Sequence, residues 1–170
     1  MGTRAVEKEF DDVDLQILEH LESDHDLNLA DLSEEVGLSK SAVHYRLNKL
    51  KDDGVITGIS ADLDPHRFGL EMLVITEVSV THESGYAADT GERIANVAGV
   101  NDVYYTMGDV DFIVTFRAQD RDQVNEVIAE LVAIDGVNET SSTFVMDEIK
   151  SDGRILANMS EEMRENVLSE

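Results

Sequence analysis

The feature that most constrains the fold is a change of apolar periodicity along the chain. Residues 11–54 carry apolar side chains at helical spacing throughout, whereas residues 72–149 alternate short apolar strands with helices. Each half is long enough to bury a small core, and 42% of the 170 residues are hydrophobic. The pattern predicts an α+β protein with a helical N-terminal domain and a C-terminal domain built on a sheet.

Three apolar stripes divide the N-terminal half into three short helices. Their members recur every three or four residues, as one buried face of a helix requires. The stripes are Val13, Ile17 and Leu21, then Leu29, Leu32 and Val36, then Val43, Leu47 and Leu50. Before the third stripe, Gly37 permits a tight turn and Ser39 is placed to cap the next helix. This order predicts a (winged) helix-turn-helix whose third helix ends at Gly54.

The C-terminal half predicts the order βαββαβ. We expect strands at 72–80, 102–107, 111–116 and 142–149, with helices at about 86–98 and 120–134. A weak internal repeat supports this order, because "AGVNDVYYT" at 98–106 resembles "DGVNETSST" at 135–143. Each copy lies where a helix ends and a strand begins. Repeated βαβ units of this kind close as a ferredoxin-like antiparallel sheet with both helices on one face.

These patterns divide the chain into four parts. They are a helix-turn-helix domain at 1–54, a linking strand and hinge at 55–71, a βαββαβ domain at 72–150 and a tail at 151–170. The only proline, Pro65, marks the point where the chain turns toward its second half. In the tail, Ser160 can cap a short helix carrying Met163 and Val167, which can dock on the body or on a second subunit.

Residues 36–51, "VGLSKSAVHYRLNKLK", contain no acid in a chain with 37 acids and 13 bases. Four of the bases lie here, giving the segment a charge of +4 within a protein of net charge −24. Elsewhere in the body, stretches without an acid do not exceed about nine residues. Random variation of charge is the alternative explanation. The coincidence with the helix that follows the "VGLS" turn favours DNA binding.

The third helix predicts a base-reading face opposite its apolar stripe. Hydrogen-bonding side chains lie in the middle of this face, cations lie at its edges, and its N-terminal end suits a phosphate. The predicted DNA-binding residues are Ser39, Lys40, Ser41, His44, Tyr45, Arg46, Asn48, Lys49 and Lys51. Such a helix fits the major groove of double-stranded promoter DNA. Arg46 lies nearer the apolar edge, so an internal pair with an acid such as Asp14 is the alternative to a phosphate contact.

Charge and missing residue types limit the protein's surroundings. The excess acids are spread along the whole chain, and high intracellular salt would screen their mutual repulsion. We therefore expect a halophilic protein in a salt-rich cytoplasm. A generally acidic, soluble protein of an ordinary cytoplasm is the alternative. No apolar run is long enough for a membrane span, and the first residues show no secretory signal, so no membrane partner is expected. The absence of cysteine excludes disulfides and thiolate metal sites, and we expect neither a metal nor a cofactor.

Taken together, these motifs resemble the Lrp/AsnC (feast/famine) family of transcription regulators. The N-terminal similarities are "D-x-x-D-x-x-I-L" in the first helix, "L-S-x-S-x-V-x-x-R" across the turn and third helix, and "G-V-I-T-G" after it. The second half resembles the family's ligand-binding RAM domain, including "GDVD" at 108–111 and "GVNETSSTFVMDEIK" at 136–150. The resemblance covers about residues 10–150. It implies a homodimer assembled through the sheets, often a higher oligomer such as an octamer, on pseudo-palindromic promoter DNA.

The resemblance also implies a small effector, usually an amino acid, bound between dimers near the "GDVD" turn. The residues expected around it are Gly108, Asp109, Val110 and Asp111 of the turn, with Ser141, Thr143 and Phe144 of the last strand. A glycine permits close backbone approach, and the two turn carboxylates can accept hydrogen bonds from an α-ammonium group. A plain hairpin in an acid-rich chain is the alternative.

Two functions are compatible with these residues. The first is a sequence-specific transcription regulator of the Lrp/AsnC type, modulated by an amino acid or a related effector, which is not an enzyme. The second is a ferredoxin-like metabolite-binding protein or enzyme whose N-terminal half mediates protein contacts. The sequence contains no nucleophile elbow, Walker loop or dinucleotide fingerprint, which favours the first function.

Overall fold

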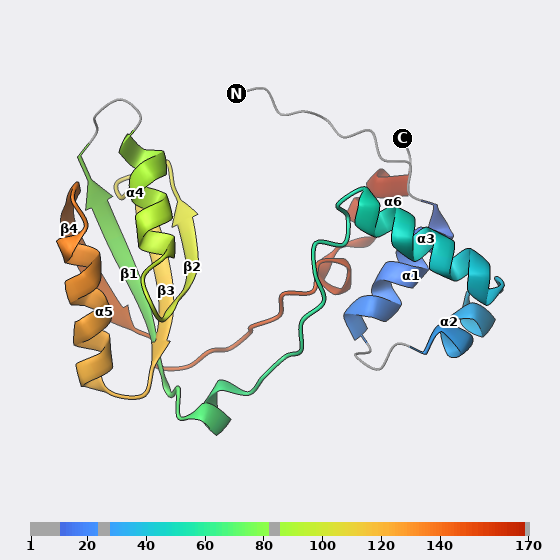
Figure 1. Ribbon diagram of the computed structural model, residues 1–170, viewed down its shortest axis with the longest axis horizontal. Coiled ribbons are helices and arrows are strands. Elements are labelled where there is room, and N and C mark those ends of the chain that lie inside the picture. Colours follow the sequence, from blue (N-terminus) through green and yellow to red (C-terminus); the bar gives the residue numbers. More distant parts are fainter. Residues whose placement is uncertain (1–10, 24–27, 82–85, 169–170) are drawn as a thin grey trace. The chain divides into compact units, whose positions relative to one another are not determined.

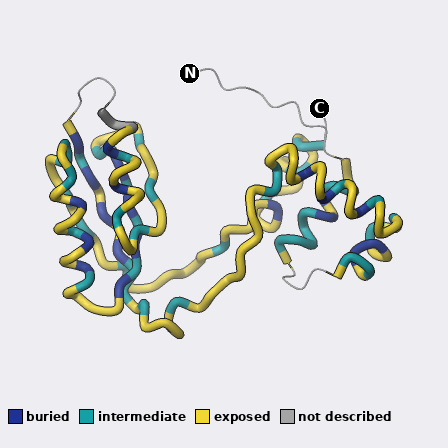
Figure 2. The backbone as a smooth tube through the Cα atoms, in the orientation of Figure 1, coloured by how far each residue is buried: buried dark blue, intermediate teal, exposed yellow. Residues whose placement is uncertain are grey.

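The computed structural model describes residues 11–23, 28–81 and 86–168, which form two compact units. The first unit combines the chain up to Asp62 with the chain from Ser151 onward, and the second spans Leu63–Lys150 (Figure 1). The chain therefore passes from one unit to the other twice. Buried residues gather in a separate core within each unit (Figure 2).

Three helices form the N-terminal part of the first unit. They are α1 (Asp12–Ser23), α2 (Leu29–Glu35) and α3 (Lys40–Asp52). Ile17, Leu32 and Val43, one from each helix, are fully buried in a common core. Gly37 makes the turn before α3 at a φ of 67°, and Ser39 Oγ caps α3 by accepting a first-turn backbone N–H at 3.2 Å. The predicted helix-turn-helix is confirmed.

The tail completes the first unit. It contains a short 3-10 helix, η2 (Leu156–Asn158), followed by α6 (Glu161–Leu168). Ser160 Oγ accepts a hydrogen bond from the Met163 N–H at 3.3 Å and so caps α6, as the sequence predicts. The tail therefore folds onto the helix-turn-helix part of its own chain.

Residues 55–64 contain no strand, although the sequence predicts a linking strand in this segment. Within the described ranges no segment pairs with them, and without a neighbouring strand the backbone groups have no ladder to join. The segment that follows forms a 3-10 helix, η1 (Pro65–Phe68), which Asp64 caps. The hinge region is thus coil and one 3-10 turn.

A four-stranded antiparallel sheet with the order β2-β3-β1-β4 carries the second unit. Its strands are β1 (Met72–Val80), β2 (Val100–Tyr105), β3 (Phe112–Ala118) and β4 (Val137–Phe144). Helices α4 (Tyr86–Ala95) and α5 (Arg121–Ala133) cover one face (Figure 1). On that face Val74 pairs with Phe116 and Val78 with Phe112, and all four are buried. The predicted ferredoxin-like βαββαβ fold is confirmed.

The last strand lies earlier than predicted. We expected it at 142–149, on the apolar residues of "STFVMDEI", but β4 ends at Phe144. Met146 and Ile149, which suggested the later position, are exposed. The repeat marks the correct start, because Gly99 and Gly136 both have a positive φ and directly precede β2 and β4. Pairing with β1 thus outweighs local hydrophobicity in setting the strand's position.

Candidate nucleic-acid interface and effector turn

The polar face of α3 is exposed. Burial of Val43, Leu47 and Leu50 turns the opposite side of the helix toward solvent. The exposed residues on α3 and its cap include Ser39, Lys40, Ser41, His44, Tyr45, Asn48, Lys49 and Lys51. Tyr45 lies near the middle of this set and is 70% exposed, so both its ring and its hydroxyl are available for contact. The residues predicted to face DNA, Arg46 excepted, therefore share one accessible surface.

Two hydrogen bonds order this surface. Ser39 Oγ lies 3.1 Å from Ser41 Oγ, and Asn48 Nδ2 lies 3.2 Å from His44 Nδ1. Because an amide nitrogen only donates, Asn48 Nδ2 is the donor and His44 Nδ1 the acceptor in this contact. The pair leaves Asn48 Oδ1 as an acceptor, the second N–H of Asn48 Nδ2 as a donor, and His44 Nε2 for contacts with base edges in the major groove.

Arg46 points toward α1 and not toward the exposed face. Its Nη1 donates to Asp11 Oδ2 and to Asp14 Oδ1, each at 2.7 Å. The side chains of Arg46 and Asp14 are only 29% and 15% exposed. The internal pair with Asp14, one of the two alternatives predicted for Arg46, is present. Arg46 thus joins α3 to α1, and we leave it out of the proposed DNA contacts.

Asp11 and Asp14 also form the N-terminal cap of α1. The Asp14 N–H donates to Asp11 Oδ1 at 2.8 Å, and the Asp11 N–H donates to Asp14 Oδ2 at 3.3 Å, which is a reciprocal capping box. Burial opposes ionisation of Asp11, but the Asp14 N–H and the Arg46 guanidinium together lower the pKa of Asp11. Hydrogen bonding to the Asp14 and Asp11 carboxylates raises the pKa of Arg46. Sequence reasoning missed Asp11 as a partner of Arg46, although the spacing of the D-x-x-D motif could have identified it.

The turn at 108–111 is held by its own hydrogen bonds. Thr106 Oγ1 donates to the Val110 carbonyl at 2.6 Å, and the Thr106 N–H donates to the Asp111 carbonyl at 2.8 Å. Asp111 Oδ2 accepts the Val80 N–H at 2.8 Å and so supports the end of β1. The carboxylate of Asp111 therefore has a structural task. Asp109 is exposed at the tip of the turn.

The strand residues predicted for the effector site do not gather at this turn. Phe144 pairs with Val74 on the helix-covered face, whereas Ser141 and Thr143 alternate onto the other face. The turn leads into β3 beside Val78. At about 3.3 Å per residue, the levels of Val74 and Val78 on β1 differ by about 13 Å. One chain alone therefore does not bring Phe144 to the turn. Ser141, opposite Glu77, is near the level of the turn, but β1 lies between them.

Across residues 11–23, 28–81 and 86–168, no group of three or more possible ligand side chains is placed to hold a metal ion. Over the same ranges no helix is both long and apolar enough to cross a membrane.

Two family models match the chain in succession. Residues 10–57 match winged helix-turn-helix DNA-binding proteins, and residues 73–155 match the Lrp/AsnC ligand binding domain. The HTH-type transcriptional regulator FL11 of Pyrococcus horikoshii is 30% identical over 136 residues, which cover 80% of this chain and 89% of the relative. The leucine-responsive regulatory protein of Escherichia coli K12 is 29% identical over 154 residues, covering 88% and 92% of the two chains.

Solved structures show the same fold. An AsnC family transcriptional regulator from Agrobacterium tumefaciens matches with a TM-score of 0.80 and 28% identity, over 86% of this chain and 96% of that chain. A transcriptional regulator from Neisseria meningitidis, solved as an L-Met complex, matches with a TM-score of 0.80 and 26% identity, over 88% and 97%. These relatives are regulators and not enzymes, which removes the enzyme alternative. The chain belongs to the Lrp/AsnC family of DNA-binding transcription regulators, with a helix-turn-helix domain followed by a ligand-binding domain.

Proposed function

We propose that this regulator binds promoter DNA in a sequence-specific manner by placing α3 in the major groove. The observation that carries the proposal is the exposed face of α3, which has no acid before the last residue of the helix, Asp52, in a chain of net charge −24. His44, Tyr45 and Asn48 read base edges from the middle of this face. The lysines at positions 40, 49 and 51 contact phosphates at its edges, and the N-terminal end at Ser39 and Ser41 receives a further phosphate.

The acidic remainder of the protein supports a salt-rich cytoplasm as its place of action. At roughly molar salt the Debye length is about 3 Å, so the repulsion among the acids is screened. Counterion release then contributes little to DNA affinity. Binding under these conditions relies on the polar groups of α3 and on the avidity of paired subunits.

The sheet face that α4 and α5 leave open supports dimerisation. On this face Ile75 is 37% and Tyr104 is 55% exposed, and Leu73 and Ile113 lie half-buried on the same side. An antiparallel sheet commonly buries such a face against a second sheet. A homodimer built in this way presents two copies of α3 to successive major grooves about one helical turn apart. An octamer is the further assembly that the family resemblance suggests.

The C-terminal unit responds to an amino acid or a related small molecule near the turn at 108–111. The support is the L-Met complex of the Neisseria regulator and the match to a ligand-binding domain. Asp109 is exposed, and a Cβ on Gly108 would meet no atom within 4 Å, so the fold of one chain makes no demand for glycine there. Because β1 lies between the turn and the strand that carries Ser141 and Thr143, a neighbouring subunit completes the site.

Selection of genomic fragments tests the proposed function. The purified full chain is mixed with fragmented genomic DNA at high potassium chloride, and the retained fragments are sequenced. We expect enrichment of a pseudo-palindromic site whose half-sites are one helical turn apart. A chain that retains no fragment above background, while sedimenting as a folded dimer, would contradict the proposal. Repeating the selection with each amino acid then identifies the effector by a change in the retained set.

A further inference from the structure

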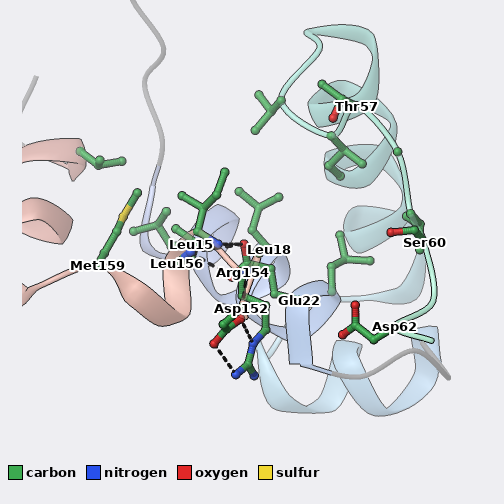
Figure 3. A pocket seen from close by; sticks show the side chains of 18 of the residues that line it. Leu15, Leu18, Glu22, Thr57, Ser60, Asp62, Asp152, Arg154, Leu156 and Met159 are labelled. Atoms are coloured by element: carbon green, nitrogen blue, oxygen red, sulfur yellow. Dashed lines mark hydrogen bonds and ion pairs between the residues drawn. The ribbon is translucent and has the colours of Figure 1, made fainter. Parts of the chain in front are cut away.

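Helix α1 is buried on two sides. Ile17 faces the three-helix core and is fully buried. Leu15 is only 7% exposed but does not belong to that core cluster. It lines a groove of about 720 Å³ together with Leu156 of η2, which is also only 7% exposed (Figure 3). The second buried side of α1 is thus the side that the tail covers.

Two acids on α1 hold the tail in place. The Glu22 carboxylate accepts three successive backbone N–H groups, from Ile155 at 2.7 Å, Leu156 at 2.9 Å and Ala157 at 3.3 Å. One turn earlier on α1, Glu19 accepts a hydrogen bond from Arg164 of α6. A carboxylate that satisfies several otherwise unpaired N–H groups forms charge-assisted bonds, which are stronger than neutral ones. These contacts make the tail a defined part of the first unit.

Arg164 ties the two parts of the tail together. Its Nη1 donates to Glu19, while its Nη2 donates to the Leu156 carbonyl at 2.7 Å.

The match to the Lrp/AsnC ligand binding domain ends at residue 155, immediately before η2. The segment that carries Leu156 and Arg164 therefore lies beyond what the family domain accounts for.

Helix α1 contacts the tail near its C-terminal end and contacts α3 at its N-terminal end. Asp11 and Asp14 fix Arg46, whereas Glu19 and Glu22 fix the tail. A continuous set of contacts thus leads from the tail through α1 to the DNA-reading helix. We propose that the C-terminal tail positions α3 for DNA through α1 and Arg46. This inference rests on the proposed function of α3 and adds a positioning role that is not part of it.

The charge of Glu22 makes the test selective. In a chain of net charge −24, removal of an acid by itself favours binding to DNA. Glu165→Gln on the exposed surface of α6 makes the same change of charge and serves as the matched control. We expect the full-length Glu22→Gln variant to bind its promoter about two- to tenfold more weakly than the Glu165→Gln variant. A Leu156→Ala variant, which changes no charge, should show a loss of similar size.

A double-mutant cycle tests the route through α1. If the tail acts through Arg46, the Glu22→Gln/Arg46→Ala variant should lose less affinity than the product of the two single losses. Losses that multiply would show that the tail and Arg46 act independently, and would overturn the route. Hydrogen exchange of residues 155–157 and of α1 checks that each variant remains folded and that the tail contact alone is released.

Crosslinking identifies the chain to which the tail belongs. The protein has no cysteine, so a Glu19→Cys/Arg164→Cys variant reacts with a short bismaleimide only at these two sites. We expect a crosslinked monomer, since the tail docks on its own α1. The variant keeps the Glu22 bonds to the tail backbone. A crosslinked dimer would overturn docking within one chain, and the absence of any crosslink would overturn docking of the tail on α1.

The outcomes separate this inference from the proposed function. If Glu22→Gln and Leu156→Ala both bind DNA as tightly as Glu165→Gln, while charge reversal of the α3 lysines abolishes binding, the positioning role is overturned and the proposed function stands. If charge reversal of the α3 lysines leaves binding intact, the proposed function fails first.

Discussion

Helices α1 and α3 differ in how they use their polar residues, although both belong to the same small unit. They contain 12 and 13 residues, and each contributes to the common core. The acids of α1 hold other segments of the chain: Asp14 holds Arg46, Glu19 holds Arg164, and Glu22 holds the tail backbone. On α3 only Arg46 shows such a contact among the described residues. The role of a charged residue in this unit therefore depends on its partners and does not follow from composition alone.

Reversing the charge of α3 is expected to have the largest effect. The triple variant Lys40→Glu/Lys49→Glu/Lys51→Glu places three acids where phosphates are expected, and we expect promoter affinity at low salt to fall by about 100-fold or more. The three lysines are exposed, so the fold should persist. Fluorescence anisotropy with labelled promoter DNA measures the loss, and circular dichroism checks the helices.

The matched control makes the same change of net charge in the other unit. Arg67→Glu/Arg93→Glu/Arg121→Glu alters three exposed bases outside α3. We expect it to weaken DNA binding far less than the α3 variant does. Equal losses in the two triple variants would mean that net charge and not α3 controls binding, and would end the contrast between the two helices.

The middle and the edge of the α3 face should respond differently to single changes. Asn48→Ala should alter the preferred base at one position, at about 1–3 kcal/mol for a good base contact. Lys49→Ala should weaken all sequences alike and reduce the salt slope by about one unit. Binding selections on randomised half-sites, repeated at several salt concentrations, distinguish the two. An Asn48→Ala variant with unchanged base preference would remove this residue from the reading face.

Breaking the link between the two helices should cost stability. Arg46→Ala leaves the partly buried Asp14 carboxylate without its guanidinium, and we expect α1 and α3 to lose about 1–2 kcal/mol of local stability. Arg93→Ala, which removes an exposed pair with Asp89 within α4, should cost about 0.3–0.5 kcal/mol. Hydrogen exchange of the amides in α1 and α3, and separately in α4, measures the two changes in stability. Equal costs would show that the Arg46 pair is no more than a surface contact.

The elements that were predictable from the sequence are those in which local pattern and long-range packing agree. The stripe of Val43, Leu47 and Leu50 placed α3 and its exposed face correctly, because one apolar face in three-residue and four-residue steps leaves little choice of orientation. β1 was predicted over the same residues, 72–80, that the structure shows. Strong periodicity fixes these elements before any tertiary contact is known.

The features that were not predictable depend on partners distant in the sequence. The apolar residues after Phe144 suggested a later strand, but pairing with β1 sets β4 earlier. The hold of Glu22 on the tail joins residues more than 130 positions apart, and one sequence contains no pattern that links them. Asp111, which the sequence suggested as an effector contact, instead accepts a hydrogen bond from the Val80 N–H at the end of β1. This partner is also distant in the sequence.

The smallest effect distinguishes the charge of Asp11 from its role as a cap. Asp11→Asn keeps the side-chain oxygen that caps α1 but removes the charge that faces Arg46. Because the folded protein lowers the pKa of Asp11, the unfolded chain binds more protons between the folded pKa and about pH 3.9. The ionised pair therefore stabilises the unit in full above about pH 5 and loses that contribution as the pH falls through the folded pKa.

The stability of the wild type relative to Asp11→Asn should thus be positive at neutral pH and shrink below about pH 4. NMR signals from α1 amides, followed during urea unfolding at several pH values, measure this difference in the free energy of unfolding of the first unit. Asp11 is 52% exposed, so added salt should also reduce the difference. A difference that stays constant from neutral pH to about pH 2.5 would show that Asp11 acts on α1 as a neutral cap, and that Asp14 alone provides the charge joining α1 to α3.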